Sequence, residues 1–378
     1  MADKTAAVLA AVLLTAGCSD SRVLREPGWA PENRERVEAF IRAHGKDSPG
    51  YDPAKPPTVA FDWDMTSIFN DLGDATFFFQ LKTLSLKLTP DELAKILPET
   101  FVTTGESLAA ERAETLEAYN TLLYFSHAHP DARTLPASEL FRYRMIQFYE
   151  RLEKVDGPPV AYPWIVKLFA NMSHAEVTAL VNTVLQRELR DPAKDERCTK
   201  LKITHPDGAS PPIEIAHGIV ASPEMKELYS ALRENGFDVY VVTASFQPVV
   251  ATLAAQYGVP ADHVIGIRLA TRPDGTFTDE VQLPITYRQG KADNIRKFLP
   301  REPIFSAGDS DTDVEMLTMP SVQLRLILDR KKKPESDIGR LYEKARVSDP
   351  EHWLIQGRND YGPDGTALGT WNGTTRTP

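Results

Sequence analysis

The sequence contains few cysteines and no excess of basic side chains. Its 378 residues include two cysteines, and 43 lysines and arginines against 53 aspartates and glutamates give a formal net charge of −10. A nucleic-acid-binding protein normally carries a basic face, so this balance argues against that class. One dense basic run, residues 330–333, follows Asp329. We interpret this run as a solvated loop, with a phosphate-binding role as the alternative.

An apolar run near the N-terminus has the features of a targeting segment. The run extends from Ala6 to Ala16 and follows Lys4. It is too short to cross a bilayer and has the length of the hydrophobic part of a signal peptide. We therefore predict that residues 1–18 are a signal peptide and that the protein is exported, with an unprocessed chain as the alternative.

The end of this run resembles the lipobox of bacterial lipoproteins. Residues 14–19 are Leu-Thr-Ala-Gly-Cys-Ser, and in a lipobox the cysteine is lipidated and becomes the first residue after cleavage. We predict lipidation of Cys18 and a membrane-anchored protein facing the periplasm, with Ser19 favouring the outer membrane. Secretion without lipid is the alternative. A lipidated Cys18 leaves Cys198 without an intramolecular partner, so we expect an inert thiol and a fold without a disulfide framework.

The composition is typical of a soluble globular protein, with 42% hydrophobic and 25% charged residues. The length allows one large domain or two of modest size. Residues 19–56 are predicted to form a tether and a lead-in helix, which begins near Pro31 and ends at Gly45. No internal repeat or low-complexity tract interrupts the chain.

A long middle segment, residues 74–216, shows helical periods separated by proline and glycine. The expected helices cover residues 76–84, 90–97, 107–125, 137–155, 164–172 and 174–190. We predict that this segment is a helical insert and that its many aromatic residues form a helix-bundle core. His127 and His129 could bind a metal ion, but we expect them to lie in a solvated loop.

Strands and helices alternate from residue 219 onward, a pattern that predicts an α/β fold with a parallel sheet covered on both faces. The expected strands cover residues 237–242, 264–270, 276–283, 304–307 and 322–328, with a hairpin turn at 272–275 and helices at 223–235, 248–257, 312–317 and from 291. Residues 57–73 and 217–378 are predicted to form this core domain. The Gly- and Thr-rich tail from Gly362 is predicted to be a loose surface segment.

Two acids follow the first strand of the predicted core. Residues 58–61 are β-forming, and Asp62-Trp63-Asp64-Met65-Thr66 comes directly after them. Ligands of open α/β sheets bind outside the carboxyl ends of the strands, so Asp62 and Asp64 could face one crevice. Taken alone, Asp-x-Asp-x-Thr also occurs in solvated turns and calcium loops.

Three further polar positions follow strand ends or open a helix. They are Thr243, Lys291 and the run Gly308-Asp309-Ser310-Asp311-Thr312-Asp313. The last run does not continue as an EF-hand, because Val314 replaces the required glycine and Pro320 the glutamate. The four motifs in this order resemble those of the haloacid dehalogenase superfamily of phosphohydrolases, over about residues 57–330. The resemblance implies a Rossmann-like core, with residues 74–216 inserted as a helical cap.

The resemblance also implies a catalytic role for three residues. Asp62 is expected to attack phosphorus and form an aspartyl-phosphate, which splits one difficult step into two. Asp64 is expected to protonate the leaving alkoxide and then to deprotonate the attacking water. Lys291 is expected to neutralise charge on the phosphoryl oxygens.

Cofactor and substrate contacts are implied in the same way. Mg²⁺ is a hard ion suited to oxygen ligands, and the expected metal site consists of Asp62, Asp64 (through its carbonyl), Asp309 and, in support, Asp313. The expected substrate-binding residues are Thr66, which also fixes the loop, Thr243 and Ala244.

The stretch from Phe69 to Phe78 is similar to that of the phosphoserine-phosphatase-like branch, which includes bacterial phosphorylcholine phosphatases. The second acid, Asp64, favours a phosphatase over a dehalogenase. We predict a Mg²⁺-dependent phosphatase for a small phosphomonoester, with phosphorylcholine or a phosphoserine-like molecule as the substrate. The alternatives are a nonspecific secreted acid phosphatase and a lipoprotein that binds phosphorylated ligands without turnover. We expect no nucleic-acid partner and membrane contact only through the lipid.

Overall fold

The computed structural model describes residues 23–126, 134–208, 210–361 and 367–376. Cys18 and the predicted signal peptide lie outside the described residues, as do His127 and His129. Among the residues in these ranges, no helix combines the length and the apolar character that a membrane span requires.

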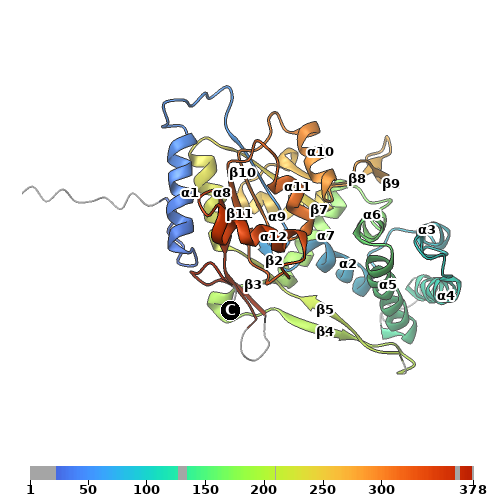
Figure 1. The fold of residues 1–378 in the computed structure, drawn as a ribbon. Coiled ribbons are helices and arrows are strands. Elements are labelled where there is room, and N and C mark those ends of the chain that lie inside the picture. The colour runs from blue at the N-terminus through green and yellow to red at the C-terminus, as the bar shows by residue number, and fades with distance from the viewer. Residues whose placement is uncertain (1–22, 127–133, 209, 362–366, 377–378) are drawn as a thin grey trace, which may run out of the picture.

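A seven-stranded sheet forms the centre of the structure (Figure 1). Its strand order is β12 (Trp353–Gln356), β11 (Leu324–Leu328), β10 (Phe305–Gly308), β1 (Thr58–Phe61), β7 (Asp238–Phe246), β8 (Val264–Thr271) and β9 (Phe277–Gln282). Neighbouring strands are parallel except β8 and β9, which form the predicted hairpin. The α/β fold with a parallel core is therefore confirmed, and β1 occupies the middle of the sheet.

Alternate residues of β1 pack against helices on opposite faces of the sheet. Val59 and Phe61 belong to a cluster with α1 (Pro31–His44), α8 (Pro223–Glu234) and α9 (Gln247–Ala254). Ala60 belongs to another cluster with α10 (Gln289–Phe298) and α11 (Val314–Leu317), next to which α12 (Asp337–Glu343) packs. Because both faces are covered, polar groups of the central strands can reach solvent mainly at the strand ends.

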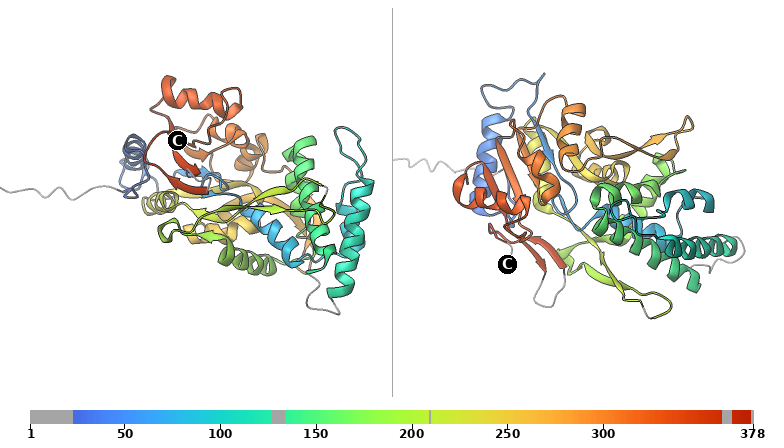
Figure 2. Two further views of the ribbon diagram at one scale, coloured as in Figure 1. Left: turned by 90° about the horizontal axis from the view of Figure 1, so that it is seen from below. Right: turned by 45° about the vertical axis from the view of Figure 1, so that its right-hand side comes forward.

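A helix-rich segment separates β1 from α8. Its helices are α2 (Leu72–Thr83), α3 (Pro90–Ile96), α4 (Ala109–Ser126), α5 (Pro136–Val155), α6 (Pro158–Lys167) and α7 (His174–Glu188). Helices α2 to α6 enclose a second hydrophobic cluster, which includes the aromatic residues Phe77, Tyr119 and Phe148. Helices α3 to α6 lie at the end of the molecule far from α1 (Figures 1 and 2). The start of α6 is six residues earlier than expected at Trp164, because Pro158 fits a first helical turn.

The insert is helical from α2 to α7, as predicted, but its last part also contains strands that were not predicted. The strands β4 (Thr199–Ile203) and β5 (Ile213–His217) form an antiparallel hairpin, and β3 (Leu189–Arg190) joins β2 (Ile68–Phe69) and β6 (Ile219–Ala221) in a small sheet. In the hairpin, Leu201 lies opposite Ile215 and Ile203 opposite Ile213, so one face of the hairpin is apolar. Helical periods do not describe this alternating segment.

The prediction of a loose C-terminal tail is also wrong for residues 367–376. The strand β14 (Ala367–Trp371) pairs with β13 (Arg358–Tyr361), and Trp371 is buried with its ring centroid 4.8 Å from that of Trp29. Short 3₁₀ turns lie at residues 192–194, 255–257, 261–263 and 311–313, with a π-helical turn at 344–348.

Candidate active site

The carboxyl ends of β1 and β10 bring Asp62 and Asp309 together. The amide of Asp62 donates to the carbonyl of Ala307 at 2.9 Å, which extends the ladder one residue past β1. The hydroxyl of Thr66 lies 3.0 Å from Oδ2 of Asp62 and 2.9 Å from Oδ1 of Asp309. Thr66 thus holds the two carboxylates side by side. It is buried, and its expected contact with the substrate stays a prediction.

Lys291 lies behind these acids, in the first turn of α10. Its Nζ is 2.5 Å from Oδ1 of Asp62 and 2.6 Å from Oδ1 of Asp313, and the side chain is fully buried. Burial alone would lower the pKa of Lys291, but the charges of Asp313 and Asp62 outweigh burial and raise this pKa above its ordinary value. Lys291 is therefore a buried cation between two carboxylates.

Asp313 is held by the loop that follows β10. Its Oδ2 accepts hydrogen bonds from the amides of Asp309 at 3.0 Å and Ser310 at 3.1 Å. A Cβ on Gly308 would lie 2.6 Å from the Cβ of Asp313, so only glycine lets Asp313 turn back beneath the strand end. This close approach explains the Gly-Asp-x-x-x-Asp spacing.

Three buried carboxylates could hold a metal ion here, because oxygens of Asp62, Asp309 and Asp313 lie within 4.8 Å of one another. Oδ1 of Asp313 bonds to Lys291, and its Oδ2 bonds to the amides of Asp309 and Ser310. The oxygens of Asp62 and Asp309 are hard donors that fit Mg²⁺. Burial and the Asp313 charge raise the pKa of Asp62, whereas Lys291 acts in the opposite direction, as a bound cation would.

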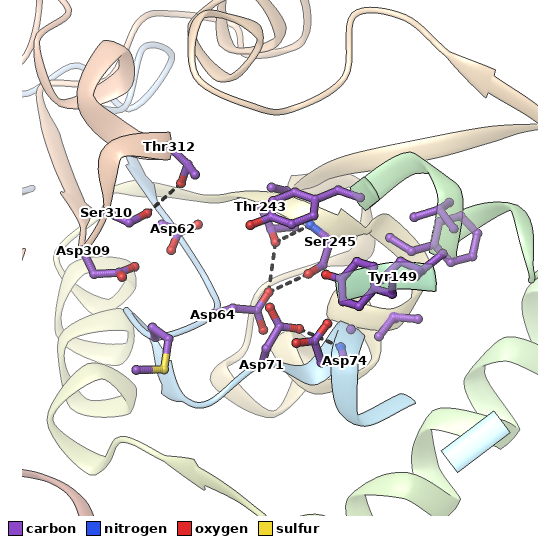
Figure 3. A pocket seen from close by; sticks show the side chains of 18 of the residues that line it. Asp62, Asp64, Asp71, Asp74, Tyr149, Thr243, Ser245, Asp309, Ser310 and Thr312 are labelled. Carbon is purple, nitrogen blue, oxygen red and sulfur yellow. Dashed lines mark hydrogen bonds between the residues drawn. The ribbon is translucent and has the colours of Figure 1, made fainter. Parts of the chain in front are cut away.

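Asp64 faces the cavity from the other side of the Asp62 loop (Figure 3). Its Oδ1 accepts from the amide of Leu72 at 2.9 Å, and its Oδ2 accepts from Ser245 Oγ at 2.7 Å and Thr243 Oγ1 at 3.4 Å. Burial, followed by the charge of Asp71, raises the pKa of Asp64 to about 8. Near neutral pH this side chain therefore carries a proton. The metal contact expected from its carbonyl stays a prediction.

A cavity of about 110 Å³ joins these groups to the helix-rich segment (Figure 3). The residues that line it from the core include Asp62, Asp64, Thr243, Ala244, Ser245, Asp309, Ser310 and Thr312. Those that line it from α2, α5, α6 and their neighbours include Asp71, Asp74, Tyr149, Tyr162 and Phe169. The structure thus brings three of the four motifs to one cavity, with Lys291 of the other motif buried behind Asp62.

A family model described as haloacid dehalogenase-like hydrolase matches residues 59–318, more than half of the chain. The chain belongs to this family. The phosphorylcholine phosphatase of Pseudomonas aeruginosa is 25% identical over 348 residues, which cover 82% of each chain. Mouse phosphoserine phosphatase is 25% identical over 146 residues, 37% of this chain and 65% of its own.

A solved structure shares almost the whole fold. It is that of a conserved protein of unknown function from Anaerococcus prevotii, with a TM-score of 0.77 at 25% identity, and the match covers 94% of this chain and 98% of that one. The family and the phosphatase relatives together show a phosphoric monoester hydrolase. Within this haloacid dehalogenase-like hydrolase, two parts of the cavity were not predicted from the motifs.

The first unpredicted part is acidic and aromatic. Asp71 caps α2 by accepting from the amide of Asp74 at 2.8 Å, and burial raises the pKa of Asp71 to about 8 and that of Asp74 to about 7. The hydrogen bond with Tyr149 acts against burial and lowers the pKa of Asp74. Tyr162 donates its hydroxyl to Glu153 at 3.3 Å. The only sequence signal was the position of both aspartates shortly after the first motif.

The second unpredicted part is Arg330, for which the prediction of a solvated loop is wrong. Its Nη1 lies 2.7 Å from Oδ2 of Asp309, its side chain is 29% exposed, and it lines the cavity. Burial would raise the pKa of Asp309, but Arg330 outweighs burial and lowers this pKa. A buried Arg358 donates to the carbonyl of Met65 at 2.6 Å. Two arginines beyond residue 318 thus contact the site, Arg330 at Asp309 and Arg358 at the loop that follows Asp62.

Proposed function

We propose that the protein hydrolyses a small phosphomonoester with the aid of Mg²⁺ and through an aspartyl-phosphate on Asp62. One observation carries this proposal: Asp62, paired with the cationic Lys291, and Asp64, with a pKa raised to about 8, line the same cavity. One acid is set up to attack and the other to donate a proton. The ion pair with Lys291 favours the carboxylate form of Asp62 against the effect of burial, whereas burial favours the protonated form of Asp64, and this difference assigns the two roles.

In the first step, an oxygen of Asp62 forms a bond to phosphorus and the ester P–O bond breaks. Asp64 gives its proton to the leaving alkoxide, which departs as the alcohol. Lys291 stays beside Asp62 and offsets the negative charge of the phosphoryl group. When bound, Mg²⁺ neutralises further phosphoryl charge, and Asp62 and Asp309 are the residues that would hold it.

In the second step, the Asp64 carboxylate takes a proton from water, whose oxygen attacks the phosphorus of the aspartyl-phosphate. The acyl phosphate P–O bond breaks, inorganic phosphate forms, and Asp62 returns as a carboxylate. Ser245 and the amide of Leu72 keep Asp64 in one orientation through both proton transfers. No other proton carrier is required.

The far end of the cavity favours a cationic head group on the substrate. Asp74, with its pKa raised to about 7, supplies partial negative charge there near neutral pH, and Asp71 ionises as the pH rises through about 8. Tyr149, Tyr162 and Phe169 supply aromatic faces. A quaternary ammonium near such faces gains about 0.5–2 kcal/mol per cation–π contact. A relative is a phosphorylcholine phosphatase, which agrees with a choline-like or amino-bearing phosphomonoester here.

Phosphate release by the protein lacking residues 1–18 tests this function. Phosphorylcholine, phosphoserine and ethyl phosphate would be compared with Mg²⁺ and with a chelator, alongside Asp62→Asn. We expect Mg²⁺-dependent release, fastest with phosphorylcholine and lowered by about 10³-fold or more in the variant. Equal rates on all esters would favour a nonspecific phosphatase. Binding of phosphorylcholine without release of phosphate would contradict the enzymatic function and indicate a binding protein.

Export with lipid on Cys18 is a separate part of the proposal. Its support is the segment of residues 1–18, in which a short apolar run, Ala6 to Ala16, is followed by Gly17 and Cys18. Mass spectrometry of the N-terminal peptide from a bacterial membrane fraction should find a diacylated Cys18, and Cys18→Ala should shift the protein to the soluble fraction. An unmodified N-terminus starting at Met1 would contradict it.

A further inference from the structure

A second cavity, of about 190 Å³, lies between α2, α5, α7 and the β4–β5 hairpin. Most of its lining is apolar and comprises Ala75, Phe78, Phe79, Leu81, Ile146, Leu201, Ile203, Ile215 and Ala216. The apolar face of the hairpin supplies Leu201, Ile203 and Ile215, and the hairpin runs beside α5 (Figures 1 and 2). An apolar cavity of about 150 Å³ can bind benzene, so this cavity has room for one ring or a short alkyl chain.

Three cations stand at the edge of this apolar cavity, although the chain as a whole has a net charge of −10. They are Lys82 on α2, Arg142 on α5 and Arg187 on α7. Across the part of the chain that the structure describes, none of the three forms an ion pair with an acidic side chain. Arg187 instead stacks over the Phe79 ring, with its guanidinium carbon 5.2 Å from the ring centroid.

The acidic residue at the cavity edge is already engaged. Glu188 accepts from the amide of Gly218 at 2.9 Å and lies 3.4 Å from Nε2 of His217. One carboxylate against three cations still leaves this edge with a net positive charge. The edge combines an apolar wall with positive charge, and a guanidinium binds a carboxylate through two parallel hydrogen bonds.

We propose that this cavity binds an amphiphilic monocarboxylate, with its alkyl chain or ring among α2, α5 and the hairpin and its carboxylate on Arg142, Arg187 and Lys82. The site is separate from the catalytic cavity, because none of its lining residues lines both. A neutral or cationic molecule with the same chain would form no ion pair with these cations, of which Arg187 stacks on Phe79 and Arg142 donates to the carbonyl of Ser138 at 3.3 Å. The ligand is therefore selected by its head group.

The two cavities share two helices. On α2, Asp74 lines the catalytic cavity and Ala75 lines the second cavity. On α5, Tyr149 lines the catalytic cavity and Ile146 lines the second cavity. A ligand in the second cavity is thus one helical turn from the groups that would hold the substrate head group. A change in KM rather than kcat follows from this placement, a consequence that rests on the proposed function.

Calorimetric titration of the purified protein with octanoate tests the site without substrate. We expect saturable binding with one site per chain, at least tenfold weaker binding of octylammonium and octanol, and at least tenfold weaker octanoate binding in Arg142→Gln/Arg187→Gln. The matched control is Arg144→Gln, which lies on the same helix but pairs with Glu114. Asp62→Asn should bind octanoate normally, so failure of the catalytic proposal would not obscure this result.

A second variant keeps the test independent of the charge change. Ile203→Trp fills the cavity and should abolish octanoate binding while the circular dichroism spectrum and thermal unfolding show a folded protein. No saturable binding of octanoate, equal binding of octylammonium, or unchanged affinity in both variants would overturn the proposal. Displacement of octanoate by inorganic phosphate would also overturn it, because that result would place the ligand in the catalytic cavity.

Discussion

The ammonium nitrogen of Lys291 lies 2.5 Å from Oδ1 of Asp62, with both side chains buried. The same nitrogen contacts Asp313 at 2.6 Å, so one cation serves two carboxylates. The substitution Lys291→Met replaces this cation by an apolar side chain and leaves Asp62 and Asp313 buried without the ammonium group that pairs with them. We expect the free energy of unfolding to fall by about 3–5 kcal/mol, measured by urea denaturation in the presence of a chelator.

A matched control for this change is Lys297→Met, on the exposed side of the same helix. It should change the free energy of unfolding by less than about 0.5 kcal/mol. Phosphate release should be lost with Lys291→Met and kept with Lys297→Met. Equal stability of the two variants would show that the buried ion pair does not stabilise the fold.

Asp64 should matter most for esters with a poor leaving group. Because its raised pKa, about 8, keeps a proton ready for the leaving oxygen, Asp64→Asn should slow release from ethyl phosphate by about 10²–10⁴-fold. With p-nitrophenyl phosphate, whose leaving group needs no proton, the first step should slow far less. Burst kinetics on both esters would separate the steps, and an equal loss in the two bursts would contradict the acid role.

Arg330 should contribute to phosphate binding. Its guanidinium is held at the cavity by Asp309, where it would face the phosphate of a bound ligand. Arg330→Gln should raise the inhibition constant of inorganic phosphate by roughly tenfold, the size of one lost charge-assisted contact. Arg346→Gln is the control, since Arg346 pairs with Asp329 instead of a cavity residue. The same inhibition constant in both variants would show that Arg330 does not contribute to phosphate binding.

The positions of the motif residues were predictable because they depend on strand ends. Once β1, β7 and β10 are parallel neighbours, their carboxyl ends lie at one edge of the sheet. Asp62, Thr243 and Asp309 then lie close together, independently of the structure of the inserted segment. The alternation of strands with helices was a strong enough signal to place those strands within a few residues.

Other features depend on contacts that no local pattern encodes. Arg330 belongs to a run of four basic residues, and only the turn after β11 directs one of them to Asp309. The hairpin segments are short, and the alternation Lys200-Leu201-Lys202-Ile203 was hidden in a region of helical periods. Trp371 is buried in a cluster that includes Trp29, which is more than 300 residues away in the sequence.

Asp74 should make the recognition of a cationic substrate depend on pH. Burial raises its pKa to about 7, so this carboxyl is neutral well below pH 7 and becomes negative as the pH rises through that value. The KM for phosphorylcholine should therefore fall by roughly tenfold between pH 6 and 8, as one charged contact is gained.

Asp74→Asn separates this titration from that of the phosphate group. Ethyl phosphate titrates at its phosphate like phosphorylcholine but has no cation, so the ratio of the two KM values isolates the head-group contact. The ratio should vary with pH in the wild-type protein and vary much less in the variant, where only Asp71, with its pKa of about 8, can still ionise. A ratio independent of pH in the wild-type protein would mean that the ammonium group does not face Asp74, and the aromatic side chains alone would then have to select the substrate.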